Sequence, residues 1–186
     1  MNRSFITECL VLKSTNYKEA DKILTLFTKN CGKVNAIAKG VRKVTSRKAG
    51  SLDIFDYSKI SLVEWHDFYI ISQAEIIKSF NELKKDLNGQ GFLYLIGETL
   101  DKLLPYREEY TELFIKTVSR LEELSKSEKR QEVLVETLVM ILLDMGYWSA
   151  EFPQDLEYIK RYIESLADNK LNSYELMEKI EQYSKS

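Results

Sequence analysis

The segment KILTLFTKNCGKVNAIAKG, residues 22–40, decides the fold of the first part of the chain. Its first half, KILTLFTK, alternates loosely between apolar and polar residues and ends in Asn30-Cys31-Gly32, a loop typical of a hairpin. In its second half, KVNAIAK, Val34 and the two alanines point to one side of a strand when Lys33 and Lys39 point to the other. The segment therefore predicts two strands, over 22–29 and 33–39.

Three further strand patterns surround this hairpin. Residues 5–13 are apolar and rich in β-branched side chains, and residues 16–19 form a turn before the next strand. Residues 52–65 and 68–74 make another pair, joined by a tight turn near His66-Asp67. Five strands in about seventy residues fit a small closed barrel of the OB type. An SH3-like barrel also fits this count, because the strand patterns do not fix the strand order.

After Phe80 the apolar residues recur at helical spacing instead. Pro105 closes the first helical stretch, and Gly146 ends the most apolar one. The predicted helices cover 83–104, 108–126, 128–145, 154–166 and 173–183. We therefore predict an α+β protein of two domains: an OB-fold barrel over residues 1–80 and an all-α helical bundle over 81–186.

Charge divides the chain unevenly. The formal net charge is -2, yet residues 1–66 hold 12 Lys and Arg against 6 Asp and Glu. No acidic residue lies between Asp21 and Asp53, whereas eight basic residues lie from Lys22 to Leu52. Such a segment is either a surface for a polyanion or an ordinary solvated loop rich in lysine.

The arrangement of the basic segment favours a nucleic-acid surface. Lys33 and Lys39 lie on one strand face, and the loop that follows carries more basic residues between Gly40 and Gly50. OB-type domains bind single strands through basic grooves and aromatic side chains, and Tyr17, Phe27 and Tyr57 are the candidate aromatics. The candidate DNA-binding residues are Lys13, Tyr17, Lys33, Lys39, Arg42, Lys43, Arg47 and Lys48.

Catalysis and metal binding find little support in the sequence. With only Cys9, Cys31 and His66, the chain cannot supply a Cys/His zinc site of four ligands, and no glycine motif cradles a phosphate. We predict no enzyme activity, no metal and no cofactor. The most apolar run, residues 133–145, is too short to span a bilayer, and no signal peptide is visible, so a cytosolic protein is expected.

Three stretches carry a family resemblance: residues 10–43, the segment SRKAGSLDIFD (46–56) and the segment ISQAEIIKSF (71–80). They contain Tyr17-x-Glu-x-Asp, Ala36-x-Ala-Lys-Gly-x-Arg and Gln73-Ala-Glu in a specific order and spacing. Over about 80 residues the chain resembles the RecO family of DNA repair proteins. Beyond Phe80 the resemblance extends only to helical pattern and length.

The resemblance implies an N-terminal OB-fold and a helical C-terminal domain. It also implies binding of single- and double-stranded DNA, annealing of complementary strands, and partnership with RecR. It further implies work on DNA coated by single-strand binding protein, where it helps RecA load, in a cytoplasmic, nucleoid-associated bacterial protein.

One departure from the family matters. Many members carry a four-cysteine zinc element after the long central helix, whereas MGYWSAEFPQDLEYIKRY, residues 145–162, contains no cysteine. We therefore expect a short form without zinc. A hypothesis of another class is a non-enzymatic adaptor whose basic barrel face docks an acidic protein partner or RNA.

Overall fold

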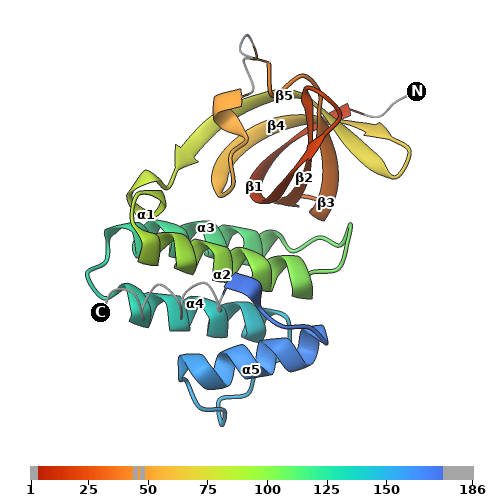
Figure 1. Cartoon of the computed structure of the whole chain (residues 1–186). Helices are drawn as coiled ribbons and strands as arrows, with labels where there is room; N and C mark the ends of the chain where they lie inside the picture. Colours follow the sequence, from red (N-terminus) through yellow and green to blue (C-terminus); the bar gives the residue numbers. More distant parts are fainter. Residues whose placement is uncertain (1–3, 44–45, 47–48, 174–186) are drawn as a thin grey trace. The chain divides into compact units, whose positions relative to one another are not determined.

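The computed structural model describes residues 4–43, 46 and 49–173, which divide into two compact units (Figure 1). The barrel unit holds the chain up to Ser79 together with Leu104–Ile115, which we call the return segment. The helical unit holds Phe80–Leu103 and the chain from Lys116 onward. The predicted domain boundary at residue 80 remains a proposal, because the return segment lies beyond it in sequence yet groups with the barrel.

Five strands close into a barrel in the order β1-β2-β3-β5-β4, and β4 pairs with β1. Neighbouring strands are antiparallel except β3 and β5, which run parallel through Ala36–Tyr69 and Ile37–Ile70. This is the OB-fold that the strand pattern and the resemblance predict, and it sets aside the SH3-like alternative. The strands are β1 (Ser4–Tyr17), β2 (Asp21–Thr28), β3 (Gly32–Ala38), β4 (Asp56–Trp65) and β5 (Phe68–Ser79).

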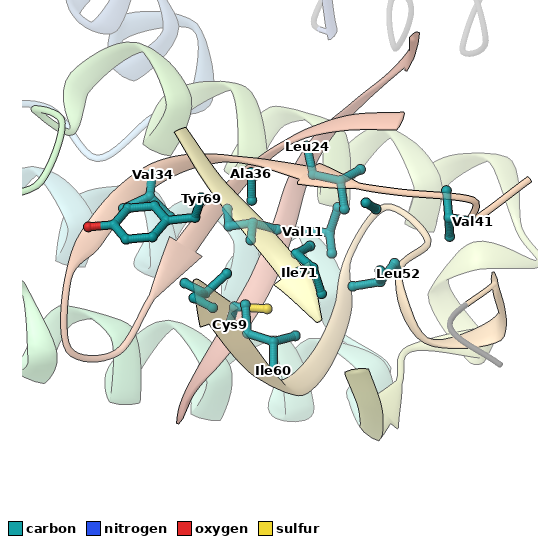
Figure 2. Close-up of a cluster of buried hydrophobic side chains, with 13 residues drawn as sticks. Cys9, Val11, Leu24, Val34, Ala36, Val41, Leu52, Ile60, Tyr69 and Ile71 are labelled. Atoms are coloured by element: carbon teal, nitrogen blue, oxygen red, sulfur yellow. The ribbon is translucent and has the colours of Figure 1, made fainter. Parts of the chain in front are cut away.

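Alternate residues of these strands fill the inside of the barrel (Figure 2). Val34, Ala36 and Ala38 all point inward, which confirms the predicted facing of the second half of the opening segment. Because side chains alternate along a strand, the polar and basic residues between them face outward. The cluster comprises Cys9, Val11, Leu24, Leu26, Val34, Ala36, Ala38, Val41, Leu52, Ile60, Leu62, Tyr69 and Ile71.

The β2–β3 turn depends on Gly32. Thr28 Oγ1 donates to the Gly32 carbonyl at 2.9 Å and accepts from the Cys31 N–H at 3.1 Å. Gly32 has φ +60°, and a Cβ placed there would lie 1.6 Å from the carbonyl oxygen of Glu108. Glycine is therefore required both by the backbone conformation and by the close approach of the return segment.

The return segment covers part of the outer surface of the barrel. The Arg107 N–H donates to the Lys33 carbonyl at 2.9 Å, and Thr111 Oγ1 donates to the Lys29 carbonyl at 2.6 Å. The Phe114 ring packs edge-on against the Phe27 ring, with centroids 5.3 Å apart. Phe27 faces outward on β2, and this contact is part of what buries it fully.

The connection from β3 to β4 delays the start of the fourth strand. A short 3₁₀ turn, η1 (Ala49–Ser51), is tied to the strand because Ser58 Oγ donates to the Ser51 carbonyl at 2.6 Å. Phe55 has φ +63°, and its N–H donates to the Val11 carbonyl at 2.8 Å. The predicted strand from residue 52 therefore begins at Asp56.

The helices agree with the helical pattern of the sequence, although the predicted helix over 83–104 is divided between α1 and α2, and α3, α4 and α5 begin two or three residues later than predicted. Asp86 explains one start, because its carboxylate accepts the Asn88 and Gly89 N–H groups at 3.1 Å each at the beginning of α2. The predicted helix over 173–183 lies almost wholly outside the described residues. The helices are α1 (Asn81–Lys84), α2 (Leu87–Leu103), α3 (Thr111–Lys126), α4 (Arg130–Asp144) and α5 (Leu156–Ala167).

Four aromatic rings fix the link between α4 and α5 in the helical unit. Trp148 is 9% exposed and meets the rings of Phe152, Tyr158 and Tyr162 edge-on at centroid distances of 5.3, 6.1 and 5.7 Å. The hydroxyl of Tyr162 donates to the carbonyl of Tyr147 at 2.6 Å. Residues 145–162, which lack the cysteines of the zinc element, are thus held by aromatic packing. We call these four rings the aromatic cluster.

Glu98 on α2 anchors the chain that follows α5. Its carboxylate accepts the Ser173 N–H and hydroxyl at 2.8 and 2.6 Å and the Asn172 N–H at 3.1 Å. The ammonium of Lys102, one turn along α2, lies 3.4 Å away. Burial alone would raise the pKa of Glu98, but these hydrogen bonds and the Lys102 charge lower it below its ordinary value.

Candidate nucleic-acid interface

A group of exposed basic residues gathers where β1 turns into β2 and where the chain leaves β3. We call it the basic corner, and it consists of Lys18, Lys39, Arg42 and Lys43, all exposed. Two of its members follow Gly40, whose φ of +65° turns the chain out of the sheet. The corner therefore brings together two turns that lie about twenty residues apart in sequence.

Backbone hydrogen bonds hold the two turns of the basic corner together. The Gly40 N–H donates to the Asp21 carboxylate at 2.7 Å, and the Arg42 N–H donates to the Ala20 carbonyl at 3.0 Å. The Arg42 guanidinium also donates to the Glu19 carbonyl at 3.1 Å. Backbone N–H groups donate two of these three hydrogen bonds, so the backbone holds the two turns together while the charged side chains remain exposed.

Lys39 stands beside an exposed aromatic ring. Its ammonium lies 5.4 Å from the ring centroid of Trp65, which is 41% exposed at the end of β4. A cation at this distance is attracted to the negative face of the indole. The lysine is thus held next to a flat apolar surface.

The structure separates Lys33 from the other predicted residues. Its side chain is 5% exposed, and its ammonium lies 4.3 Å from the ring centroid of Tyr106 in the return segment. At about 3.3 Å per residue, Lys33 and Lys39 lie roughly 20 Å apart along β3. The return segment therefore covers Lys33, and its part in DNA binding stays a prediction.

Two predicted residues of β1 lie on its outer surface. Lys13 is exposed beside an irregularity in the β1–β2 pairing between Val11 and Lys13. Tyr17 is 37% exposed at the end of β1, and the Lys18 ammonium lies 5.2 Å from its ring centroid. Tyr17 therefore adjoins the basic corner, whereas Lys13 lies four residues before it on the same strand.

The other predicted aromatics serve the interior. Phe27 is fully buried, and the Tyr57 hydroxyl donates to the Glu8 carboxylate at 2.6 Å while its ring faces Phe114 at 6.0 Å. Phe27 thus has no exposed face, Tyr57 is half-buried, and Tyr17 alone of the three is exposed. Arg47 and Lys48 lie outside the described residues, and their part in binding stays a prediction.

Sequence reasoning missed Trp65, Tyr106 and Arg107. The Arg107 guanidinium donates to the Asp67 carbonyl at 3.0 Å and lies 5.4 Å from the Tyr69 ring centroid, so it sits at the β4–β5 turn. Tyr106 beside it is 52% exposed. An aromatic next to a tight turn was the available signal for Trp65. No local signal places residues 106 and 107, since Pro105 indicates only the end of a helix.

The thiols of the barrel unit belong to its packing. Burial raises the pKa of the Cys9 thiol far above its ordinary value, with Asp56 adding to the effect, and burial likewise raises the pKa of Cys31. A protonated, buried thiol is a poor nucleophile and a poor metal ligand. Across the described part of the chain, no three Cys, His, Asp or Glu side chains gather closely enough to hold a metal ion.

The strands of the barrel lie within a region that matches a known protein family. A family model described as "Recombination protein O N terminal" matches residues 1–80. The chain is 32% identical over 142 residues to a DNA repair protein RecO of Caldanaerobacter subterraneus, a match covering 76% of this chain and 58% of that protein. None of the described helices is both long enough and apolar enough to cross a membrane.

Two further relatives have the same name. A DNA repair protein RecO of Clostridium novyi is 32% identical over 148 residues, which covers 80% of this chain and 58% of the relative. One of Heliobacterium modesticaldum is 39% identical over 103 residues, covering 55% of this chain and 38% of the relative. The matched region thus covers between 38% and 58% of the length of these three relatives.

Proposed function

The chain belongs to the RecO family through its N-terminal OB-fold, and we propose that it is a DNA-binding mediator of DNA repair and recombination. In this proposal it binds single- and double-stranded DNA and anneals complementary strands. Residues 1–80 form the nucleic-acid-binding domain and residues 81–186 the helical domain. The family membership supports the repair role, and the basic corner supports the binding step.

The basic corner is the single observation that carries the proposal. Lys39, Arg42 and Lys43 are exposed, and the turn that carries them is held by the backbone N–H groups of Gly40 and Arg42. Phosphates bound by such residues release condensed counterions, which supplies sequence-independent affinity. Residues 81–186 are acidic by contrast, with 14 Lys and Arg against 21 Asp and Glu.

Annealing by this surface requires no bond to be made or broken. Cations between two strands reduce the repulsion of their phosphates and leave the base edges available for pairing. We therefore propose a binding protein and not an enzyme. We also propose RecR and single-strand binding protein as its partners and RecA as the recombinase that it helps indirectly, in the bacterial nucleoid. The family membership is what supports these partners.

Charge reversal at the corner tests the proposal. We expect Lys39→Glu, Arg42→Glu and Lys43→Glu, combined in the full chain, to weaken binding of a fluorescent 20-nucleotide single strand roughly 100-fold or more. A matched control reverses three exposed residues of the helical unit, Lys126, Lys129 and Arg161. Equal losses in both proteins would show that only net charge matters and would contradict a site at the corner.

Salt dependence and annealing sharpen the test. If five to six phosphates are contacted, the slope of log affinity against log salt on single strands should be about -4. The wild-type chain should also accelerate pairing of two complementary labelled strands, and the corner variant should not. If the wild-type chain binds no DNA but captures an acidic protein or RNA through the same residues, the adaptor hypothesis replaces this one.

A further inference from the structure

Exposed aromatic rings accompany the cations of the barrel unit. Tyr17, Trp65 and Tyr106 are 37%, 41% and 52% exposed. Each has a lysine ammonium over its ring, at centroid distances of 5.2, 5.4 and 4.3 Å. A single exposed apolar side chain is ordinary on a protein surface, but three cation-bearing rings on one small unit form a pattern that phosphate binding alone does not explain.

Contacts of neighbouring residues link the segments that carry these rings, which we call the strip. The turns that carry Tyr17 and Lys39 are joined by the hydrogen bonds of Gly40 and Arg42. Lys39 reaches Trp65, and the turn after Trp65 accepts the Arg107 guanidinium through the Asp67 carbonyl. Tyr106 directly precedes Arg107 in the return segment. The strip therefore runs from the end of β1 to the β4–β5 turn and the return segment.

Beyond the basic corner, attraction of phosphates by positive charge does not by itself explain how the strip would bind DNA. Glu64 and Asp67 are exposed on either side of Trp65 and His66, so the β4–β5 turn itself carries negative charge, and the cations beside it, Lys39 and Arg107, come from other segments. Affinity for DNA that is contributed by the β4–β5 turn must then come mainly from contacts other than the neutralisation of phosphates. An exposed indole supplies such a contact, because every nucleobase has an apolar face that stacks on an aromatic ring.

The geometry around Trp65 suits stacking. Trp65, the last residue of β4, pairs with Phe68, the first residue of β5, so the ring stands at the closed end of the hairpin. The His66 ring meets the indole edge-on at 5.1 Å, and Lys39 lies over one face. A planar indole has a second face, and an ammonium beside it is placed to meet the phosphate of a stacked nucleotide.

We propose that Trp65, with Tyr106 beyond it, is a stacking platform for unpaired bases, so that a single strand runs from the basic corner across the β4–β5 turn. This inference rests on the proposed DNA-binding function and adds a preference to it. Bases in a duplex are already stacked on their neighbours, so the platform serves single strands only. The basic corner then binds both forms, and Trp65 distinguishes them.

The test compares Trp65→Ala with Trp65→Phe in the full chain. Binding is measured by anisotropy with fluorescent dT15 and with a 15-base-pair duplex. We expect Trp65→Ala to weaken dT15 binding about 5- to 150-fold, the range for losing one stacked base, and to change duplex binding less than about twofold. Trp65→Phe should retain most of the dT15 affinity. Tyr147→Ala, at a ring 40% exposed in the helical unit, is the matched control.

Intrinsic fluorescence gives a second readout that needs no variant to fold. The chain has two tryptophans, and Trp148 is buried in the helical unit, so dT15 should quench the emission of Trp65 and the duplex should not. Equal loss on both DNAs in Trp65→Ala, no loss, or no quenching by dT15 would overturn the platform. If the corner variant loses binding while Trp65→Ala does not, only this inference fails. If the wild-type chain binds neither DNA, the proposed function fails as well.

Discussion

The barrel unit and the helical unit use charge in opposite ways. In the barrel, an apolar cluster and backbone hydrogen bonds maintain the fold, and Lys39, Arg42 and Lys43 stand outside that framework. In the helical unit, Glu98 and the ion pair of Arg130 with Asp86, at 2.7 Å, tie separate segments together. Lys39 and Lys43 of the barrel unit are thus available for a ligand, whereas several charges of the helical unit are part of its structure.

The largest effect on stability is expected at Trp148 in the aromatic cluster. Trp148→Ala removes a buried ring that touches three others and should lower the free energy of unfolding by about 3–5 kcal/mol. Trp148→Phe should cost much less, because Nε1 has no hydrogen-bond partner among the described residues. Urea unfolding followed by circular dichroism measures both. Similar losses for the two variants would contradict a cluster held by ring packing.

The second largest effect on stability is expected at Gly32 in the barrel unit. Gly32→Ala must adopt a positive φ, at a cost of about 1–2 kcal/mol. It must also displace the Glu108 carbonyl oxygen, which lies 1.6 Å from the position that the new Cβ would take. We expect a total loss of about 2–4 kcal/mol, measured by urea unfolding. The control is Gly40→Ala, which has a similar φ but no heavy atom nearer than 3.8 Å and should show the smaller cost alone.

Glu98 makes the helical unit sensitive to acid. Its pKa is lowered by folding, so its contribution to stability is complete above its ordinary value of 4.5 and is lost as pH falls through the folded value. Glu98→Gln should cost about 1–2 kcal/mol at pH 7 and should flatten the decline of stability below pH 4.5. If stability depended on pH in the same way in the variant and in the wild-type chain, Glu98 would not be the cause of the acid sensitivity.

The smallest effect on stability is expected at the basic corner. This prediction tests most directly whether the charges of the two units differ in their contribution to the fold. Lys39→Ala and Lys43→Ala should each change the free energy of unfolding by less than about 0.5 kcal/mol, because substitutions of exposed surface side chains rarely change stability by more than this. Thermal unfolding by circular dichroism measures this. A loss near that of Glu98→Gln would show that the corner also supports the fold and would end the contrast between the units.

Local pattern was sufficient to predict most of the architecture. Period-two alternation located the strands, and helical spacing located the helices, because each depends on neighbours in sequence. The return segment could not be predicted, since its contact with Lys33 depends on packing between residues more than seventy positions apart. For the same reason the burial of Lys33 could not be predicted, whereas Lys39, Arg42 and Lys43 lie exposed. The part of all four residues in DNA binding stays a prediction.

The contact between Phe27 and Phe114 has a consequence for the order of events during synthesis. All five strands have been made once residue 79 is complete, but Phe114 follows Phe27 by 87 residues. A nascent barrel therefore exposes an apolar ring on its outer wall until the start of α3 leaves the ribosome. The same exposure would make residues 1–80, cut from the rest, prone to self-association.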